Sequence, residues 1–253
     1  MTQRRFGRLQ AVASLVLAMG RVPFWLAVEA GSTRGRAHER AFFARIAKGF
    51  GITIELCGTV DRAPGTLFVM NHISWADIPV ILAAIDADFV AKGDIARWPF
   101  IGRLALRLDP VFVARDEQYQ SHHQVDAIRA RLRKGRSVIL CPEGTTSDGT
   151  GILPFRTSLF AAADVVQSVQ PICLTYLDRK GQALKPQRMR EVAWINDDDL
   201  LAGAARLARE TTLARVELLP PISVESHANR KQLAGAVRHC IAEAYAAAAN
   251  LPR

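Results

Sequence analysis

The chain has 253 residues, and 49% of them are hydrophobic, which is enough to bury one sizeable core. The mean hydropathy of +0.07 is too low for a polytopic membrane protein, and no run reaches the ~18–20 uninterrupted apolar residues of a clean membrane span. The net charge is +9, and residues 1–48 hold most of this excess, with nine basic and two acidic side chains.

The first predicted element is an apolar segment with a basic start. Residues 9–20 read LQAVASLVLAMG, and Arg21 separates them from a second apolar stretch, VPFWLAVEA. A secretory signal is one interpretation, but Arg21 breaks its apolar run and the cleavage site is weak. A transmembrane helix would have to bury Arg21 or let it snorkel, and Pro23 would kink it. A helical anchor that lies in one leaflet tolerates both features, so we favour a basic and apolar membrane anchor over residues 1–49.

The basic charge of this segment also indicates its partner. A basic side chain near an anionic lipid surface contributes about 1 kcal/mol of attraction. Nucleic acid would attract the same charge, but no zinc-finger, homeodomain or RNA-recognition signature accompanies it. The sequence therefore predicts a membrane lipid partner and no nucleic-acid partner.

The rest of the chain predicts an α/β layered domain over residues 50–253. GSTRGR (31–36) reads as a linker, and residues 37–49 read as a short amphipathic helix. After Gly51, short β-rich runs alternate with helical stretches, and several runs are apolar throughout, as in central strands covered on both faces. The expected strands are 52–58, 66–71, 88–92, 111–115, 137–141, 171–176 and 214–220. The expected helices are 75–85, 119–134, 199–210 and 229–249.

The four cysteines are far apart in the sequence and form no CxxC pair. Each lies in or beside an apolar run, which favours buried free thiols in a reducing compartment over zinc ligands or disulfides. These residues are Cys57, Cys141, Cys173 and Cys240.

The first chemical signal is NHISWAD (71–77), which directly follows the apolar run TLFVM. His72 is thus expected at the carboxyl end of a strand, where open α/β sheets place their sites. Ser74 offers a helix N-cap, with Asp77 three positions on as in a capping box, so the helix is expected to begin at Trp75. The turn lets His72 fold back toward Asp77, which would hold the imidazole tautomer and stabilise the imidazolium. A purely structural turn and cap is the alternative. Ser74 as a nucleophile is a less economical reading than Ser74 as a cap.

The second signal is SVILCPEGTTSDG (137–149), in which an apolar strand runs into a polar loop. A glycine allows a tight turn that exposes N–H groups, and exposed amides and hydroxyls suit a phosphate or an oxyanion. Glu143 could hold a positive group or a substrate hydroxyl. The alternative is a polar surface turn, because Asp148-Gly149 is an ordinary turn pair. The loop lacks the GxxxxGK[ST] pattern, so it is not a nucleotide P-loop.

Three further basic residues are candidates for contact with a phosphate, and two of them end predicted strands. Arg115 ends FVAR, Lys92 ends DFVAK, and Arg156 lies in LPFRTSLF. Each can pair with a phosphate, and each can equally be a surface charge.

Together these segments resemble the glycerolipid acyltransferase family of the lysophosphatidate acyltransferase type. The resemblance covers roughly residues 50–222 and rests on four blocks in the same order. They are NHISWAD with its histidine–four residues–aspartate motif, DPVFVAR, CPEGTTS and QPICLTY. Each block alone is unspecific, whereas four in this order are specific.

The resemblance implies a fold, an activity and roles for individual residues. The fold is an αβ sandwich with an N-terminal helical membrane motif, and the enzyme works at the cytoplasmic face of the inner or plasma membrane. His72 is implied as general base and Asp77 as its orienting partner. The implied substrate-binding residues are Lys92, Arg115, Glu143, Gly144, Thr145 and Thr146. The donor is acyl-CoA or acyl-carrier protein, and no metal or cofactor is needed.

The implied mechanism is direct transfer of the acyl group. His72 deprotonates the hydroxyl of a lysolipid, which attacks the thioester carbonyl, and backbone N–H groups of the 144–147 loop stabilise the oxyanion.

Two departures from the family pattern bear on the acceptor. Thr146 stands where the family commonly has arginine, and Asp109-Pro110 stands where a glycine often precedes the second block's apolar pair. Both weaken the case for a phosphate-bearing acceptor, and EGTTSDG followed by LPFRTSLF also resembles the lyso-ornithine-lipid acyltransferase branch. We predict lysophosphatidate as acceptor, because that specificity is the commoner one, with lyso-ornithine lipid as the alternative.

Two further alternatives come from other classes of protein. One is a non-catalytic membrane-binding scaffold. The other is a lipid hydrolase, which the lack of a GxSxG nucleophile elbow disfavours. The oligomeric state and the preferred acyl chain length are left open by the sequence.

Overall fold

The computed structural model describes residues 13–14, 16–29, 31–61, 63–92, 111–113, 118–196 and 198–250. Its strands form one sheet in the order β1-β7-β6-β2-β5-β3-β4, and β8 pairs with β6. The strands are β1 (Ile52–Cys57), β2 (Leu67–Met70), β3 (Asp88–Lys92), β4 (Val111–Val113), β5 (Val138–Leu140), β6 (Ser168–Leu177), β7 (Thr212–Leu218) and β8 (Ile222–Ser223).

Strand direction brings the two chemical motifs to one edge of the sheet. β2 pairs in parallel with both β5 and β6, so the carboxyl ends of these strands point the same way. Among the strands that the structure describes, β6 pairs antiparallel with β7 and β8, and the other pairs are parallel. Every residue of β2 and β5 is buried, as the continuous apolar runs in the sequence predicted for central strands. The NHISWAD turn (residues 71–77) therefore lies beside the CPEGTTS loop (residues 141–147).

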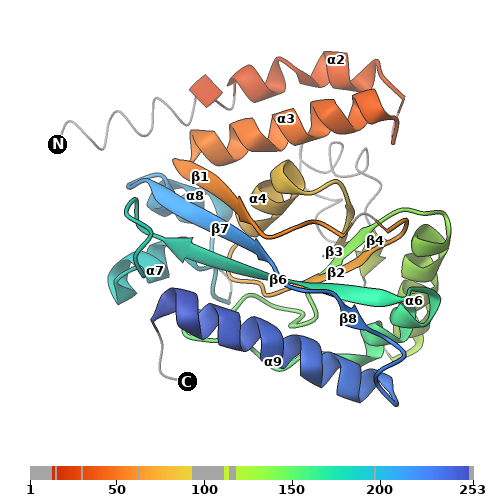
Figure 1. Ribbon diagram of the computed structural model, residues 1–253. Helices are drawn as coiled ribbons and strands as arrows, with labels where there is room; N and C mark the ends of the chain where they lie inside the picture. The colour runs from red at the N-terminus through yellow and green to blue at the C-terminus, as the bar shows by residue number, and fades with distance from the viewer. Residues whose placement is uncertain are drawn as a thin grey trace.

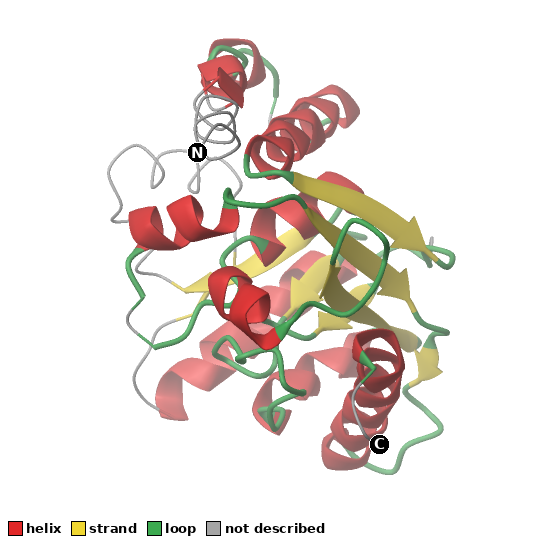
Figure 2. Cartoon of the chain, turned by 90° about the vertical axis from the view of Figure 1, so that its left-hand side faces the viewer, coloured by secondary structure: helices red, strands yellow, loops and turns green. Residues whose placement is uncertain are grey.

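Helices cover both faces of the sheet, which confirms the predicted layered α/β fold (Figures 1 and 2). One side carries α2 (Val22–Leu26), α3 (Thr33–Gly49) and α4 (Asp77–Ala84). The other side carries α6 (Gln118–Arg133), the 3-10 helix η2 (Thr157–Val165) and α9 (Arg230–Ala249). Two short helices, α7 (Pro186–Val192) and α8 (Leu200–Leu207), connect β6 to β7.

Two predicted helix starts and one burial pattern differ from the structure. The linker predicted at 31–36 is wrong for residues 33–36, because the Ser32 hydroxyl caps the helix by accepting from the Gly35 amide at 3.1 Å. Helix α4 begins at Asp77 instead of Trp75, since residues 75–76 form a turn. All four cysteines are free, but only Cys173 is fully buried, and the other three are half-buried.

The N-terminal helices pack together through aromatic side chains and leave one apolar side exposed. The Trp25 and Phe42 rings lie 5.5 Å apart, and Trp25 is buried between α2 and α3. Among the described residues, exposed large hydrophobic side chains gather in this segment: Val16, Leu17, Met19, Phe24 and Leu26. None of the helices in the described ranges has both the length and the apolar character needed to cross a bilayer.

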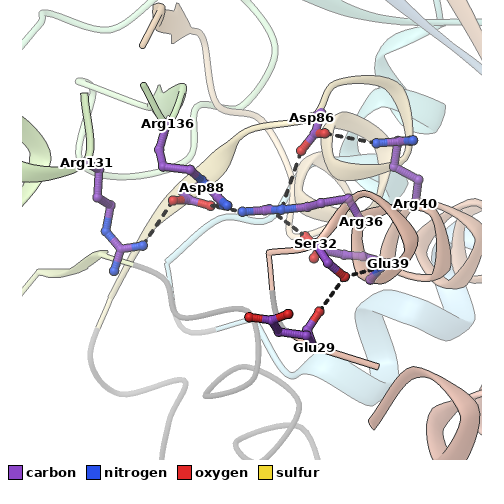
Figure 3. Close-up of polar contacts among 10 residues, drawn as sticks. Glu29, Ser32, Arg36, Glu39, Arg40, Asp86, Asp88, Arg131 and Arg136 are labelled. Carbon is purple, nitrogen blue, oxygen red and sulfur yellow. Dashed lines mark hydrogen bonds and ion pairs between the residues drawn. The ribbon is translucent and has the colours of Figure 1, made fainter. Parts of the chain in front are cut away.

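A buried cluster of charges joins α3 to the sheet (Figure 3). Arg36 of α3 donates to Asp88 at the start of β3 at 2.7 Å and also contacts Glu39 at 3.4 Å. Asp88 is 3% exposed and accepts from two further arginines, Arg131 at 3.0 Å and Arg136. Three guanidinium groups thus surround one buried carboxylate. Burial raises the pKa of the Glu39 carboxyl to about 7, against the opposing effect of Arg36. The cluster fixes α3 to the body of the protein.

Candidate active site

The turn after β2 is anchored by a buried asparagine. Backbone pairing of β2 with β6 ends at Met70 and Ile172. The side chain of Asn71 then continues it, because its amide donates to the Leu174 carbonyl at 2.9 Å and its oxygen accepts from the Leu174 amide at 2.8 Å. Asn71 is 0% exposed, so this substitute for a strand pair fixes where the chain leaves the sheet. His72 is the next residue.

His72 and Asp77 form a close pair. Nδ1 of His72 lies 2.7 Å from Oδ2 of Asp77, which confirms the predicted folding back of the histidine. The same oxygen accepts from the amides of Ile73 at 2.7 Å and Ser74 at 3.0 Å. Asp77 is 0% exposed, whereas the His72 side chain keeps 19% of its surface exposed. A buried carboxylate that binds Nδ1 leaves Nε2 of the partly exposed ring to meet a substrate.

The Ser74 hydroxyl forms hydrogen bonds with two backbone groups. Ser74 is buried, donates to the Val192 carbonyl at 2.6 Å and accepts from the Ala76 amide at 3.3 Å. These bonds occupy the hydroxyl and argue against a nucleophilic serine. The predicted Ser74 cap is wrong, however, because the N-cap of α4 is Ala76, which has no side-chain cap bond.

The CPEGTTS loop holds the backbone of His72 from both sides. The His72 amide donates to Oε1 of Glu143 at 2.7 Å, and the His72 carbonyl accepts from the Ser147 amide at 2.8 Å. The second carboxylate oxygen of Glu143 accepts from the Leu153 amide at 2.9 Å. Glu143 is 5% exposed, and this burial raises its pKa to about 7 although both backbone bonds act in the opposite direction. What the structure gives Glu143 is a positioning contact to His72, and its substrate-binding role stays a prediction.

Gly144 and Arg156 lie against each other. Gly144 has φ 69°, and a Cβ at this position would lie 2.5 Å from Nε of Arg156. The left-handed backbone favours glycine at this position, and any larger residue would also require the Arg156 side chain to move. Arg156 is exposed, and no acidic side chain of the described residues forms an ion pair with it. A solvent-facing cation therefore covers the glycine of the loop.

Residues 192–194 form hydrogen bonds with both motifs, and the sequence analysis did not identify this segment. The Trp194 amide donates to the Ile73 carbonyl at 2.9 Å, and the Thr146 hydroxyl donates to the Trp194 carbonyl. The Thr146 hydroxyl is thus used in a bond within the protein, whereas the Thr145 side chain is exposed on the loop.

The structure brings together six of the eight predicted site residues: His72, Asp77, Glu143, Gly144, Thr145 and Thr146. Lys92 is the last residue of β3, and Arg115 lies outside the described residues, so their roles stay predictions. Within the described ranges, no group of three or more histidine, cysteine or acidic side chains is arranged to hold a metal ion.

Sequence reasoning missed Tyr176, whose hydroxyl donates to Oδ1 of Asp77 at 2.7 Å. The two residues are 99 positions apart, so only the sheet brings them together. The fourth block, QPICLTY, ends at this tyrosine.

Comparisons with known proteins identify the family of the chain. The sequence profile of the Acyltransferase family matches residues 51–175. The chain is 38% identical over 192 residues to the lyso-ornithine lipid O-acyltransferase of Rhizobium meliloti (strain 1021), covering 72% of this chain and 66% of that protein. A protein of the same name from Brucella abortus (strain 2308) is 32% identical over 236 residues, covering 89% of this chain and 88% of that protein. The fold is similar to that of the 1-acyl-sn-glycerophosphate (LPA) acyltransferase PlsC from Thermotoga maritima, with a TM-score of 0.64, 16% identity and 96% coverage of both chains. The chain therefore belongs to the Acyltransferase family, as its four sequence blocks predicted.

Proposed function

We propose that this protein transfers an acyl group from acyl-CoA or acyl-carrier protein to the free hydroxyl of a lysolipid, with His72 as general base. The observation that carries this proposal is the 2.7 Å contact between Nδ1 of His72 and the fully buried carboxylate of Asp77. Such a contact fixes the tautomer in which Nε2 accepts a proton, and it stabilises the imidazolium that results.

The proposed reaction has two steps, both served by His72. Nε2 takes the proton of the acceptor hydroxyl while its oxygen attacks the thioester carbonyl, which forms a tetrahedral oxyanion. The intermediate then collapses, the carbon–sulfur bond breaks, and the imidazolium returns the proton to the departing thiolate. The new ester and a free thiol are the products.

The oxyanion donors are proposed to be the amides of Thr145 and Thr146. In the described part of the chain, the neighbouring amides of Gly144 and Ser147 are used by the carbonyls of Cys141 and His72. The Thr145 and Thr146 amides follow the left-handed Gly144, in a turn of the kind that presents successive N–H groups to an anion.

Lyso-ornithine lipid is the first candidate acceptor. The two relatives named above are lyso-ornithine lipid O-acyltransferases, and the Thr146 hydroxyl, at the family's usual arginine position, is bonded to Trp194. Arg156 would then pair with the ornithine carboxylate, because it is the cation that lies on the loop. Lysophosphatidate is the second candidate, since the four blocks resemble that type and Arg156 would equally bind its phosphate.

We also propose that residues 1–49 anchor the protein to the cytoplasmic face of the membrane and that residues 50–253 form the acyltransferase domain. The exposed apolar side chains of residues 16–26 support the anchor, since they would be covered by lipid. Both candidate donors are cytoplasmic molecules, which supports the face.

The test is an acyl-transfer assay on detergent-purified protein with labelled acyl-CoA or labelled acyl-carrier protein. Parallel reactions contain lyso-ornithine lipid, lysophosphatidate or no acceptor. His72→Ala is expected to lose activity by a factor of roughly 10³ or more. His239→Ala is the matched control, because His239 is 73% exposed on α9.

Each outcome decides between the candidates. Labelled ornithine lipid alone supports the first acceptor, and labelled phosphatidate alone supports the second. Folded protein that transfers no acyl group, together with lipid binding that survives His72→Ala, would favour a non-catalytic scaffold.

A further inference from the structure

The carboxylate of Asp77 is bonded unevenly at its two oxygens. Oδ2 is hydrogen-bonded to the His72 ring and to two backbone amides, whereas Oδ1 accepts a hydrogen bond from the Tyr176 hydroxyl at 2.7 Å. Asp77 is 0% exposed, and no lysine or arginine of the described residues forms an ion pair with it. A buried carboxylate without a cation stays ionised only if hydrogen-bond donors replace its water. Tyr176 is the side-chain donor that Oδ1 has in the described structure.

Tyr176 is suited to act as a permanent donor. Its side chain is fully buried, and burial together with the charge of Asp77 raises its pKa well above the ordinary value. The phenol therefore keeps its proton at any pH at which the protein is folded and active. It can donate to Asp77, and it cannot become a second negative charge beside it.

The position of the phenol is set by the sheet. Strand β6 continues past its last backbone pair with β2, and Asn71 holds this extension at Leu174. Tyr176 is two residues further along the same strand, and the residues of β6 from 169 to 177 are all buried. A strand that is buried and bonded in this way holds its side chains more rigidly than a loop.

We propose that Tyr176 is a positioning residue for the His72–Asp77 pair. Its hydroxyl holds Oδ1, so that Oδ2 faces Nδ1 of His72, and it spreads the negative charge of the carboxylate. This inference rests on the proposed function, in which His72 is the base. It also gives the fourth sequence block a part in the chemistry, through a hydrogen bond to the Asp77 carboxylate.

Removing the hydroxyl has a predictable sign. In Tyr176→Phe, Oδ1 loses its donor, and the carboxylate concentrates its charge and attracts the imidazolium more strongly. The acidic limb of the pH profile of kcat/KM is therefore expected to move to higher pH. A hydrogen bond of ordinary strength to a charged group corresponds to a shift of about one pH unit. The loss of kcat/KM is therefore expected to approach tenfold at pH values below the acidic limb and to vanish above it.

The experiment compares Tyr176→Phe with Tyr245→Phe. Tyr245 is 1% exposed and donates to the Gly149 carbonyl at 2.8 Å, so its variant loses a buried phenol bond of the same kind without touching Asp77. Both variants are expected to unfold at lower temperature, and only Tyr176→Phe is expected to shift the pH profile. Site-specific 3-fluorotyrosine at position 176 keeps the size of the ring and makes a stronger donor, so it is expected to move the limb to lower pH. This second variant serves if Tyr176→Phe does not fold.

His72→Ala is assayed alongside to separate the two proposals. If His72→Ala is inactive while neither change at position 176 moves the pH profile relative to wild type, the role of Tyr176 is overturned and the base is retained. If His72→Ala keeps wild-type activity, the proposed function itself fails.

Discussion

At the scale of single residues, the site depends on buried side chains that hydrogen-bond its other residues. Asp77 binds Nδ1 of His72. In the described structure, the side-chain hydrogen bonds of Asn71, Glu143 and Tyr176 go to backbone groups or to the Asp77 carboxylate. Around these bonds the His72 ring is partly exposed, and Thr145 and Arg156 are exposed. Buried hydrogen bonds of this kind fix the positions of a few exposed groups, as is expected where catalysis needs fixed geometry.

Arg156→Gln is expected to weaken acceptor binding. The apparent KM for lyso-ornithine lipid should rise about tenfold while kcat changes less than about twofold, because a lost charge-assisted contact made equally in ground and transition states affects KM. Steady-state kinetics in mixed micelles measures both constants. Lys134→Gln is the charge-matched control, since Lys134 is exposed at the end of α6, at the opposite end of β5 from the CPEGTTS loop. An unchanged KM in Arg156→Gln would remove this residue from the acceptor site.

At the scale of elements, sequence patterns predicted the features that depend on residues close together in the chain. The apolar runs identified the strands because β2 and β5 are buried along their whole length. The spacing within NHISWAD predicted the His72–Asp77 contact because five residues and one turn suffice to make it. Tyr176, Asn71 and the 192–194 segment could not be found in this way. Their contacts join strands and loops about 100 residues apart, and no periodicity in one sequence records such a pairing.

Helix α3 is the element whose attachment depends most on charge. Asp88→Asn removes the charge shared by Arg36, Arg131 and Arg136. The buried guanidinium of Arg36 then keeps only its longer contacts among the described ion pairs, to Glu39 at 3.4 Å and Asp86 at 3.6 Å. We expect the free energy of unfolding to fall by about 3–5 kcal/mol, the usual effect of breaking a buried pair. Urea denaturation followed by circular dichroism measures it.

Asp126→Asn is the control for that measurement. Asp126 pairs with Arg129 at 3.0 Å on the surface of α6, where 67% of its side chain is exposed. Its loss should change stability by less than about 1 kcal/mol. Equal effects of the two variants would show that the cluster around Asp88 contributes no more than a surface pair.

At the scale of the whole molecule, two buried carboxyls make stability depend on pH. Burial raises the pKa of both Glu39 and Glu143 from 4.5 to about 7. The folded protein therefore binds these protons more tightly than the unfolded chain does between those values, so stability falls as pH rises from about 5 to about 8. Each carboxyl contributes up to about 3 kcal/mol to this fall.

Denaturation at a series of pH values tests this dependence. Glu39→Gln should remove part of the slope without altering the site, because Glu39 lies in the α3 cluster. Constant stability of the wild type between pH 5 and pH 8 would contradict the prediction.

The two bonds between the CPEGTTS loop and the peptide groups of His72 also limit how this enzyme can change its substrate. Glu143 takes the His72 amide, and the Ser147 amide binds the His72 carbonyl. A loop taken from a relative with another acceptor would change the geometry of these two bonds. The backbone of His72 would then move, and the imidazole would move with it. A change of acceptor specificity made in this loop is therefore expected to alter proton transfer as well. Substituting side chains that take no part in these two bonds, such as Arg156, is expected to change the acceptor without moving His72.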